Sequence, residues 1–367
     1  MLAEPPFSYL ETLDRVDDAI ESNAEVARLI LESGILAFRS VARSPGQESV
    51  LPEEWVGVAK HQDIDKARST LRQLFRDWTA EGARERDVCY TPTVKALEAE
   101  KPRHPDGYSL KVLVPGAGLG RLVFDLCLKG FDVEGNELSY HQLMASSYIL
   151  NCTQRAEQHT IFPWIHTFSN HRIRENHLRG YKMPDIHPGE TLRSASSFGS
   201  MSMSAADFLC LYSDDEHREM FDAVACVFFL DTAPNLIRYL DTMFHTLKPG
   251  GVLVNFGPLL WHFEDNAPGN HGRDDDGDGE HDANNSSGIA DPGSFELADD
   301  EVRALVERMG FVVEAWETGI EAPYIHDTQS MLRTTFMSSS WVARKPEALG
   351  KAGESAFTGG FVGSSLL

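Results

Sequence analysis

The chain has 367 residues, of which 42% are hydrophobic and 10% aromatic, so it can bury one large core or two smaller ones. Its net charge of −23 argues against a general nucleic-acid binder, because phosphate contacts need clustered Lys and Arg. No apolar run reaches the roughly 18 residues of a membrane span, and the N-terminus lacks the pattern of a signal peptide, so no membrane partner is expected.

Cysteine usage predicts a reducing compartment. The five cysteines are odd in number, scattered and free of any CxxC pair. Reduced thiols of this kind are typical of cytoplasmic or nuclear proteins.

The N-terminal part is expected to be helical. Residues 11–38 carry apolar side chains near helical spacing with acidic residues between them, and residues 63–82 place Leu71, Leu74 and Trp78 on one side. No strand-like alternation precedes residue 110. We therefore predict that residues 1–105 form a helical extension packed on a sheet domain.

From residue 111 onward, apolar strands alternate with helical segments. Strands are predicted at 111–115, 131–136, 221–231, 252–256, 311–316 and 338–344, with helices at 119–130, 138–151, 234–247 and 298–309. The last two strands follow each other without a crossover helix, which favours an antiparallel pair. The fold class predicted for residues 106–346 is α/β, a Rossmann-like, mostly parallel sheet with an antiparallel C-terminal edge.

Three segments are expected to lie outside this regular structure. Residues 152–205 are predicted to be irregular, and their five histidines lack the spacing of a metal site. Residues 265–294 are rich in Gly, Asp, Asn and Ser and are expected to form a disordered acidic insertion. Its Asp274 resembles the start of a calcium loop, but Asn285 occupies the place of the bidentate Glu. The tail, 347–367, is also expected to be disordered.

The glycine turn after the first strand predicts a nucleoside site. The sequence runs G-x-G-x-G through Gly116 and Gly118, and Glu137 follows Gly116 by 21 residues at the end of the second strand. That spacing places an acid on ribose hydroxyls in βαβ nucleotide sites. Arg121 replaces the third glycine of the dinucleotide fingerprint, so S-adenosylmethionine is favoured over NAD. A tight turn without a ligand is the structural alternative.

Other candidate residues are expected near the edge of the sheet where parallel strands end and ligands bind. Asp207 and Phe208 precede the central strand by a short interval and could bind the amino group of an adenine and cover its ring. Asp231 ends a central strand and could face the reactive end of the cofactor or cap the next helix. His262 follows the next strand and could be a ligand-binding or a core histidine.

Several motifs resemble those of the carnosine N-methyltransferases across roughly residues 60–346. They are Gln73-x-x-Arg76-Asp-Trp78, Val114-Pro-Gly-Ala-Gly-Leu-Gly-Arg121, Gly135-Asn-Glu137, Phe162-Pro-Trp-Ile-His166, Phe228-Phe-Leu-Asp-Thr-Ala233 and Gly257-Pro-Leu-Leu-Trp-His-Phe-Glu264. The resemblance implies a class I methyltransferase that transfers a methyl group from S-adenosylmethionine to an imidazole nitrogen of carnosine, giving anserine. It also implies a possible homodimer and, for some members, histidine in proteins as the acceptor.

The resemblance assigns roles to individual positions. It implies that Gln73 and Arg76 hold the methionine end of the cofactor, Gly116 contacts it through the backbone, and Glu137 binds its ribose. The glycine pattern itself adds Gly118 as a cofactor-binding residue. The resemblance further implies that Asp207 and Phe208 bind the adenine side, while Asp231 and His262 bind a small histidine-containing peptide. We also expect Asp231 to act as the catalytic residue, by accepting the ring N–H of that peptide and taking up its proton. The sequence departs from the family at Thr334–Phe336, where a tyrosine cluster is expected. Alternatives are another histidine-containing acceptor, a non-catalytic cofactor-binding scaffold, or a dehydrogenase.

Overall fold

A computed structural model describes residues 1–38, 57–262 and 295–347. The predicted acidic insertion at 265–294 lies outside the described residues, and so does the predicted tail from residue 348 onward. None of the helices within the described ranges is both long and apolar enough to cross a bilayer.

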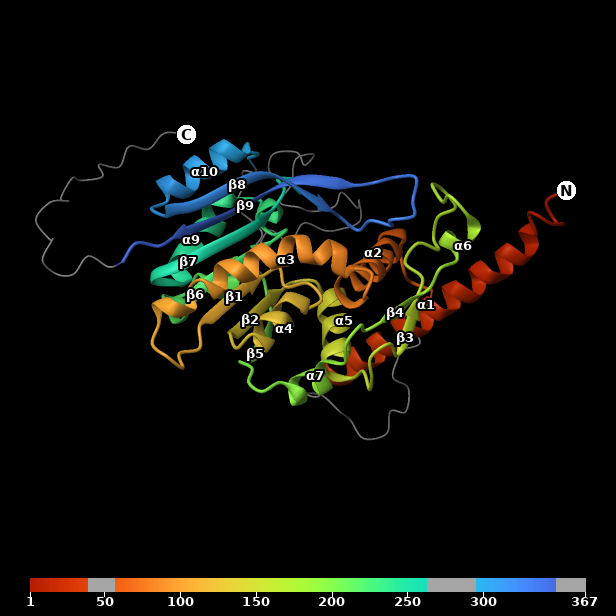
Figure 1. Ribbon diagram of the computed structural model, residues 1–367, viewed down its shortest axis with the longest axis horizontal. Helices are drawn as coiled ribbons and strands as arrows, with labels where there is room; N and C mark the ends of the chain where they lie inside the picture. Colours follow the sequence, from red (N-terminus) through yellow and green to blue (C-terminus); the bar gives the residue numbers. More distant parts are fainter. Residues whose placement is uncertain (39–56, 263–294, 348–367) are drawn as a thin grey trace, which may run out of the picture.

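The described residues build a seven-stranded sheet with the order β5-β2-β1-β6-β7-β9-β8 (Figure 1). Neighbours from β5 to β7 are parallel, whereas β9 is antiparallel to both β7 and β8. The predicted Rossmann-like fold and its antiparallel C-terminal edge are confirmed. The strands are β1 (Lys111–Pro115), β2 (Asp132–Glu137), β5 (Met201–Ala205), β6 (Phe221–Val227), β7 (Leu247–Gly257), β8 (Val312–Pro323) and β9 (Thr335–Arg344).

The central strands were recognisable because they are buried on both faces. Every residue of β6 before Val227 is buried, as parallel strands covered by helices require. The prediction that this strand extends to residue 231 was wrong. Phe228 adopts a positive φ of 53°, which turns the chain out of the sheet into a short 3-10 helix, η4 (Leu230–Thr232).

The prediction that residues 152–205 are irregular was also wrong. They hold the hairpin strands β3 (His159–Ile161) and β4 (Tyr181–Met183), the short helices α6 (Arg174–His177) and α7 (Pro188–Ser194), and β5 at the sheet edge. The β5 sequence, Met201-Ser-Met-Ser-Ala205, is only partly buried, so it lacks the apolar signal of the central strands.

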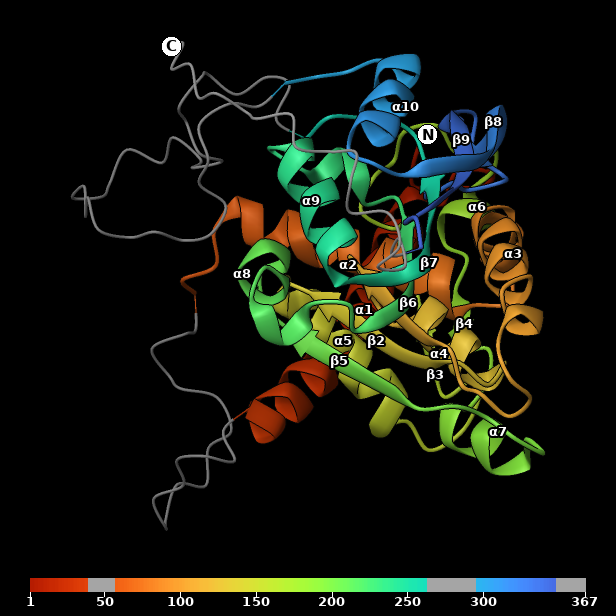
Figure 2. The same cartoon turned by 90° about the vertical axis from the view of Figure 1, so that its left-hand side faces the viewer.

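Helices cover both faces of the sheet. Figure 2 shows α8 (Phe208–Tyr212), α9 (Leu236–Thr246) and α10 (Asp299–Arg308) on one face and α3 (Ala83–Glu98) on the other. One apolar core joins the first group to β6, β7 and β9, and a second joins α3 and α4 (Arg121–Leu128) to β1, β2, β6 and β7. The sheet is therefore buried on both sides, and its carboxyl-end edge is left to form a site.

The N-terminal helices pack against the sheet domain. Helix α1 (Tyr9–Phe38) lies along α5 (Tyr140–Asn151) and β3, and α2 (His61–Trp78) reaches the glycine turn. Trp78 is fully buried, and its indole N–H donates a hydrogen bond of 3.1 Å to the carbonyl oxygen of Leu119. This contact brings the side chains of α2 to the ends of β1 and β2.

Candidate active site

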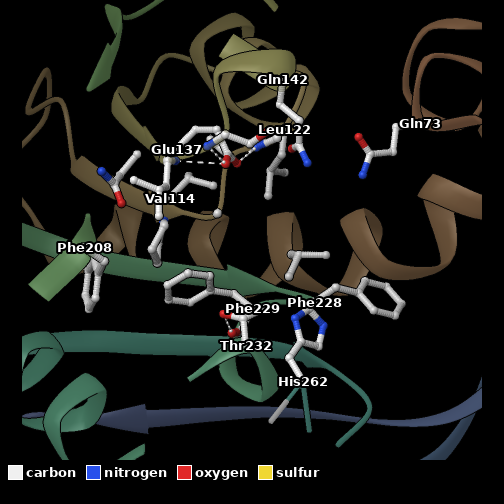
Figure 3. Close-up of a pocket in the computed structure, with 18 of the residues that line it drawn as sticks. Gln73, Val114, Leu122, Glu137, Gln142, Phe208, Phe228, Phe229, Thr232 and His262 are labelled. Atoms are coloured by element: carbon white, nitrogen blue, oxygen red, sulfur yellow. Dashed lines mark hydrogen bonds between the residues drawn. The ribbon is translucent and has the colours of Figure 1, made fainter. Parts of the chain in front are cut away.

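A cavity of about 680 Å³ opens at the carboxyl ends of β1, β2 and β6. Figure 3 shows Glu137 and Gln73 on one side of it and His262 beside Phe228 on the other. All but one of the predicted site residues line this cavity: Gln73, Arg76, Gly116, Gly118, Glu137, Asp207, Phe208 and His262. Residues up to 189 positions apart in the sequence, Gln73 and His262, are thus brought to one site where the topology of the sheet places ligands.

The glycine turn requires its glycines. Gly116, Gly118 and Gly120 all have positive φ angles, of 65°, 57° and 74°. A Cβ atom on Gly116 would lie 2.6 Å from the ring of Phe229, which itself lines the cavity. The turn therefore keeps the backbone close to the aromatic wall and presents peptide groups, rather than side chains, to a ligand.

Glu137 holds the glycine turn and the turn after β2 together. One carboxylate oxygen accepts the N–H of Gly118 at 2.9 Å, and the other accepts the N–H groups of Leu138 and Ser139 at 2.9 and 2.8 Å. A carboxylate offers about four acceptor directions, and three are used here. One remains for a hydroxyl group of a ligand in the cavity.

The predicted adenine side is formed just after the edge strand β5. Asp207 caps α8, with a carboxylate oxygen accepting the N–H of Cys210 at 3.0 Å. The ring of Phe208 packs edge to face on Phe229 and Tyr239, with centroids 5.5 and 5.3 Å apart. These aromatic rings form an apolar wall suited to a flat heterocycle.

Gln73 and Arg76 enter the cavity from α2. Asp77 binds the Arg76 guanidinium at two points, with Nε–Oδ1 and Nη2–Oδ2 distances of 2.6 and 3.0 Å. Burial opposes the charge, but Asp77 holds the pKa of Arg76 well above its usual value. Two of the five guanidinium N–H donors are used, which fixes the fork while leaving donors for a ligand carboxylate. The side-chain oxygen of Gln73 is buried and lacks a hydrogen-bond partner among the described residues.

Asp231 does not line this cavity in the described structure. It is 4% exposed, its Oδ2 accepts the N–H of Leu260 at 3.0 Å, and its carbonyl oxygen accepts the N–H of His262 at 3.0 Å. Burial raises the pKa of Asp231 to about 6, and partial burial lowers the pKa of His262. His262 is therefore neutral at pH 7. Asp231 is hydrogen-bonded to the segment 260–262 that carries His262.

Phe228 and Tyr324 form a wall that the sequence analysis missed. Both line the cavity, and their ring centroids are 5.2 Å apart. Phe336 packs on both rings, at 6.3 Å from Phe228 and 5.5 Å from Tyr324, and the Arg76 guanidinium lies 6.0 Å from the Tyr324 ring. No local pattern marks Tyr324, because it reaches the site through the long β8–β9 hairpin.

The predicted absence of a metal site concerns the histidine-rich stretch 152–205. Across the described ranges, no three His, Cys, Asp or Glu side chains gather in a way that could hold an ion. Within the stretch 152–205, the buried His177 is hydrogen-bonded to Arg174 and to the carbonyl oxygen of Ile165.

A sequence model of the carnosine N-methyltransferase family matches residues 53–347. The chain belongs to the carnosine N-methyltransferase family. The carnosine N-methyltransferase of Schizosaccharomyces pombe is 35% identical over 348 residues, which cover 94% of this chain and 85% of that protein. The family member from Rattus norvegicus is 33% identical over 339 residues, covering 91% of this chain and 75% of its own length.

The solved structures found are less similar to this chain than these relatives are. A SAM-dependent methyltransferase from Methanosarcina mazei is 14% identical with a TM-score of 0.38, covering 65% of this chain and 94% of that one. The fold assignment rests on the strand order of the sheet itself.

Proposed function

We propose that this protein transfers a methyl group from S-adenosylmethionine to an imidazole nitrogen of carnosine, giving anserine. The observation that carries the proposal is one cavity that combines the glycine turn, Glu137 and Arg76 with His262 in a member of the carnosine N-methyltransferase family. The cofactor would supply an electrophilic methyl group.

The donor side of the cavity fits the chemical groups of this cofactor. Glu137 has one acceptor direction left for a ribose hydroxyl, and Arg76 retains donors for the amino-acid carboxylate. Phe208 and Phe229 offer an apolar wall for the adenine. Gln73, whose side-chain oxygen has no hydrogen-bond partner in the described part of the chain, would accept a hydrogen bond from the ammonium group.

Asp231 would take the proton of the acceptor ring. An imidazole with a pKa of about 6.5 is mostly neutral at pH 7, so the enzyme must select its tautomer and orient its lone pair. A carboxyl group with a pKa of about 6 is ionised at that pH and can accept the ring N–H. Asp231 is hydrogen-bonded to the segment 260–262, and His262 of that segment lines the cavity. For Asp231 to act in this way, the ring of the acceptor must therefore contact it next to His262.

The acceptor wall contains one observation that favours a second substrate. Phe336 packs beside Tyr324 where the family resemblance leads us to expect a tyrosine, so a hydroxyl for the polar ends of the dipeptide is missing. The alternative acceptor is therefore histidine in another peptide or in a protein.

The test is a panel of acceptors incubated with the purified protein and labelled S-adenosylmethionine, followed by mass spectrometry. The panel contains carnosine, other histidine dipeptides and a longer histidine-containing peptide. Label in carnosine at the highest kcat/KM supports the proposal, and preference for the longer peptide supports the alternative. Cofactor binding without any transfer would contradict both and leave a non-catalytic scaffold.

A further inference from the structure

The cavity wall that carries Tyr324 is held by a buried carboxylate from the other end of the chain. Glu85, in the first turn of α3, accepts the N–H of Ile325 at 2.6 Å through one oxygen and the N–H of His326 at 3.1 Å through the other. Glu85 is 7% exposed. Two backbone groups that follow β8 are thus fixed to the N-terminal extension across 240 positions of sequence.

These two hydrogen bonds fix an unfavourable backbone conformation. Ile325 has a φ of 46°, in the left-handed region that a β-branched residue rarely adopts. Such a conformation persists only where the surroundings determine it. Burial raises the pKa of Glu85, and the hydrogen bonds from Ile325 and His326 together with the Arg76 charge oppose that effect. The carboxylate therefore stabilises a bend directly beside the cavity.

The bend determines where Tyr324 lies. Tyr324 precedes Ile325, and its N–H donates to the carbonyl oxygen of Thr334 across the hairpin. The far part of the connection is attached separately, since the N–H of Met331 and the hydroxyl of Ser330 both donate to the carbonyl oxygen of Asn170, at 2.7 and 3.2 Å. Loss of the Glu85 bonds would therefore release the cavity end of the connection, while the β8–β9 pairing and the far attachment remain.

We propose that Glu85 is a positioning residue for the methyl acceptor. It holds Tyr324 against Phe228 and Arg76, and so sets the affinity for the acceptor without lining the cavity itself. The inference rests on the proposed function and assigns to α3 a part in acceptor recognition.

The first test is the kinetics of Glu85→Gln in the full-length protein with carnosine. A glutamine has the same shape but presents an N–H₂ group to one of the two N–H donors. We expect the acceptor KM to rise about tenfold, the effect of losing one hydrogen bond to a charged group. The value of kcat and the Kd for S-adenosylhomocysteine should stay within about twofold of wild type.

The matched control is Glu81→Gln, just before α3. Glu81 is exposed, and its one ion pair within the described ranges is with Arg179 across the surface at 3.3 Å, so its replacement should leave both constants unchanged. An unchanged acceptor KM in Glu85→Gln would overturn the proposal. A parallel loss of cofactor affinity would also overturn it, because Glu85 would then support the whole cavity.

A double-mutant cycle tests whether Glu85 acts through Tyr324. If it does, Glu85→Gln should not raise the acceptor KM further in a Tyr324→Ala background. Additive effects would contradict the proposed route.

A second variant is available if Glu85→Gln does not fold. Glu85→Asp retains the charge on a shorter side chain and can be measured in the same double-mutant cycle. An acceptor KM equal to wild type in that variant would overturn the inference.

Hydrogen exchange tests the positioning independently of turnover. In Glu85→Gln the amides of Ile325 and His326 should exchange faster, while those of β1 and of Gly118 stay protected. Unchanged exchange at 325–326 would overturn the inference even if the kinetics changed. Failure of wild type and Glu81→Gln alike to methylate carnosine would instead count against the proposed function, and exchange would still decide the role of Glu85.

Discussion

Two carboxylates of the site differ because their surroundings differ. Glu137 accepts three backbone N–H groups, which hold together the glycine turn and the turn after β2. Asp231 is buried with fewer hydrogen bonds, and its pKa rises to about 6. The first is therefore suited to bind hydroxyl groups and the second to exchange a proton near neutral pH.

Replacement of Glu137 should weaken cofactor binding. Glu137→Ala removes the remaining acceptor for a ribose hydroxyl and leaves three N–H groups without their partner. Hydrogen bonds to charged groups contribute about 1.5–3 kcal/mol, so the Kd for S-adenosylhomocysteine should rise by at least about tenfold. Titration calorimetry measures this Kd. A Kd equal to wild type would remove Glu137 from the cofactor site.

The turnover of the enzyme should depend on the ionisation of Asp231. The carboxylate must be ionised to accept the ring proton, so kcat should rise as pH increases through about 6 and level off above it. Asp231→Asn can still accept the N–H of Leu260 but cannot take a proton. We expect its kcat at pH 7.5 to fall by about 10²–10⁴-fold with an unchanged cofactor Kd.

The control for this prediction is the acceptor itself, because its imidazole titrates in the same range. Any dependence that comes from the acceptor alone should persist in Asp231→Asn. A kcat close to wild type in this variant would show that Asp231 only supports the segment at 260–262.

At the scale of elements, α2 and α3 are joined to the glycine turn by buried ion pairs. Asp185 accepts hydrogen bonds from Arg86 of α3 at 2.6 Å and from Arg121, the first residue of α4, at 2.7 Å. Arg121 also donates to the carbonyl oxygen of Asp77 at 2.9 Å, beside Arg76. The arginine that replaces the third glycine of a dinucleotide fingerprint therefore attaches the N-terminal helices to the glycine turn.

Loss of Asp185 should destabilise the protein strongly. Asp185→Ala leaves the guanidinium groups of Arg86 and Arg121 buried without their shared carboxylate, and breaking a buried pair in this way costs about 3–5 kcal/mol. Denaturant unfolding measures the loss. The exposed pair of Glu98 with Lys129 provides the control, and Glu98→Ala should leave the midpoint unchanged. A small effect of Asp185→Ala would show that the network does not join the elements.

Elements could be predicted from the sequence where they are buried and carry a local sequence pattern. The strands β1 and β6 have largely apolar sequences, and the glycines of the turn are required by positive φ angles, so both were predicted. The edge strand β5 has no such sequence, and the contact of Glu85 with Ile325 joins distant segments. Tertiary contacts of this kind leave no periodic pattern, which is why Tyr324 and Glu85 were missed.

At the scale of the whole molecule, the N-terminal extension and the sheet are expected to behave as one unit. Trp78 is fully buried against the glycine turn, and Cys89 of α3 packs with Phe256 of β7 and Ala322 of β8. Neither part keeps a separate core at this junction, so we expect the predicted boundary near residue 105 to mark a change of architecture rather than a division between independently folding domains.

This view predicts a single unfolding transition. Differential scanning calorimetry of the full-length protein should show one cooperative transition, shifted upward as a whole by S-adenosylhomocysteine, because residues of both parts line the cavity. Two resolved transitions, with only the later one shifted by the ligand, would show that the helical extension folds separately and does not contribute to the site.

The most direct test of the central claim is NMR of carnosine after incubation with the enzyme and S-adenosylmethionine carrying a ¹³C-labelled methyl group. We expect one new ¹³C methyl signal on a nitrogen of the imidazole ring, formed by wild type and nearly absent with Asp231→Asn. A cofactor-bound protein that leaves carnosine unmethylated, or that labels its amino group instead of the ring, would show that the protein is not an imidazole N-methyltransferase of carnosine.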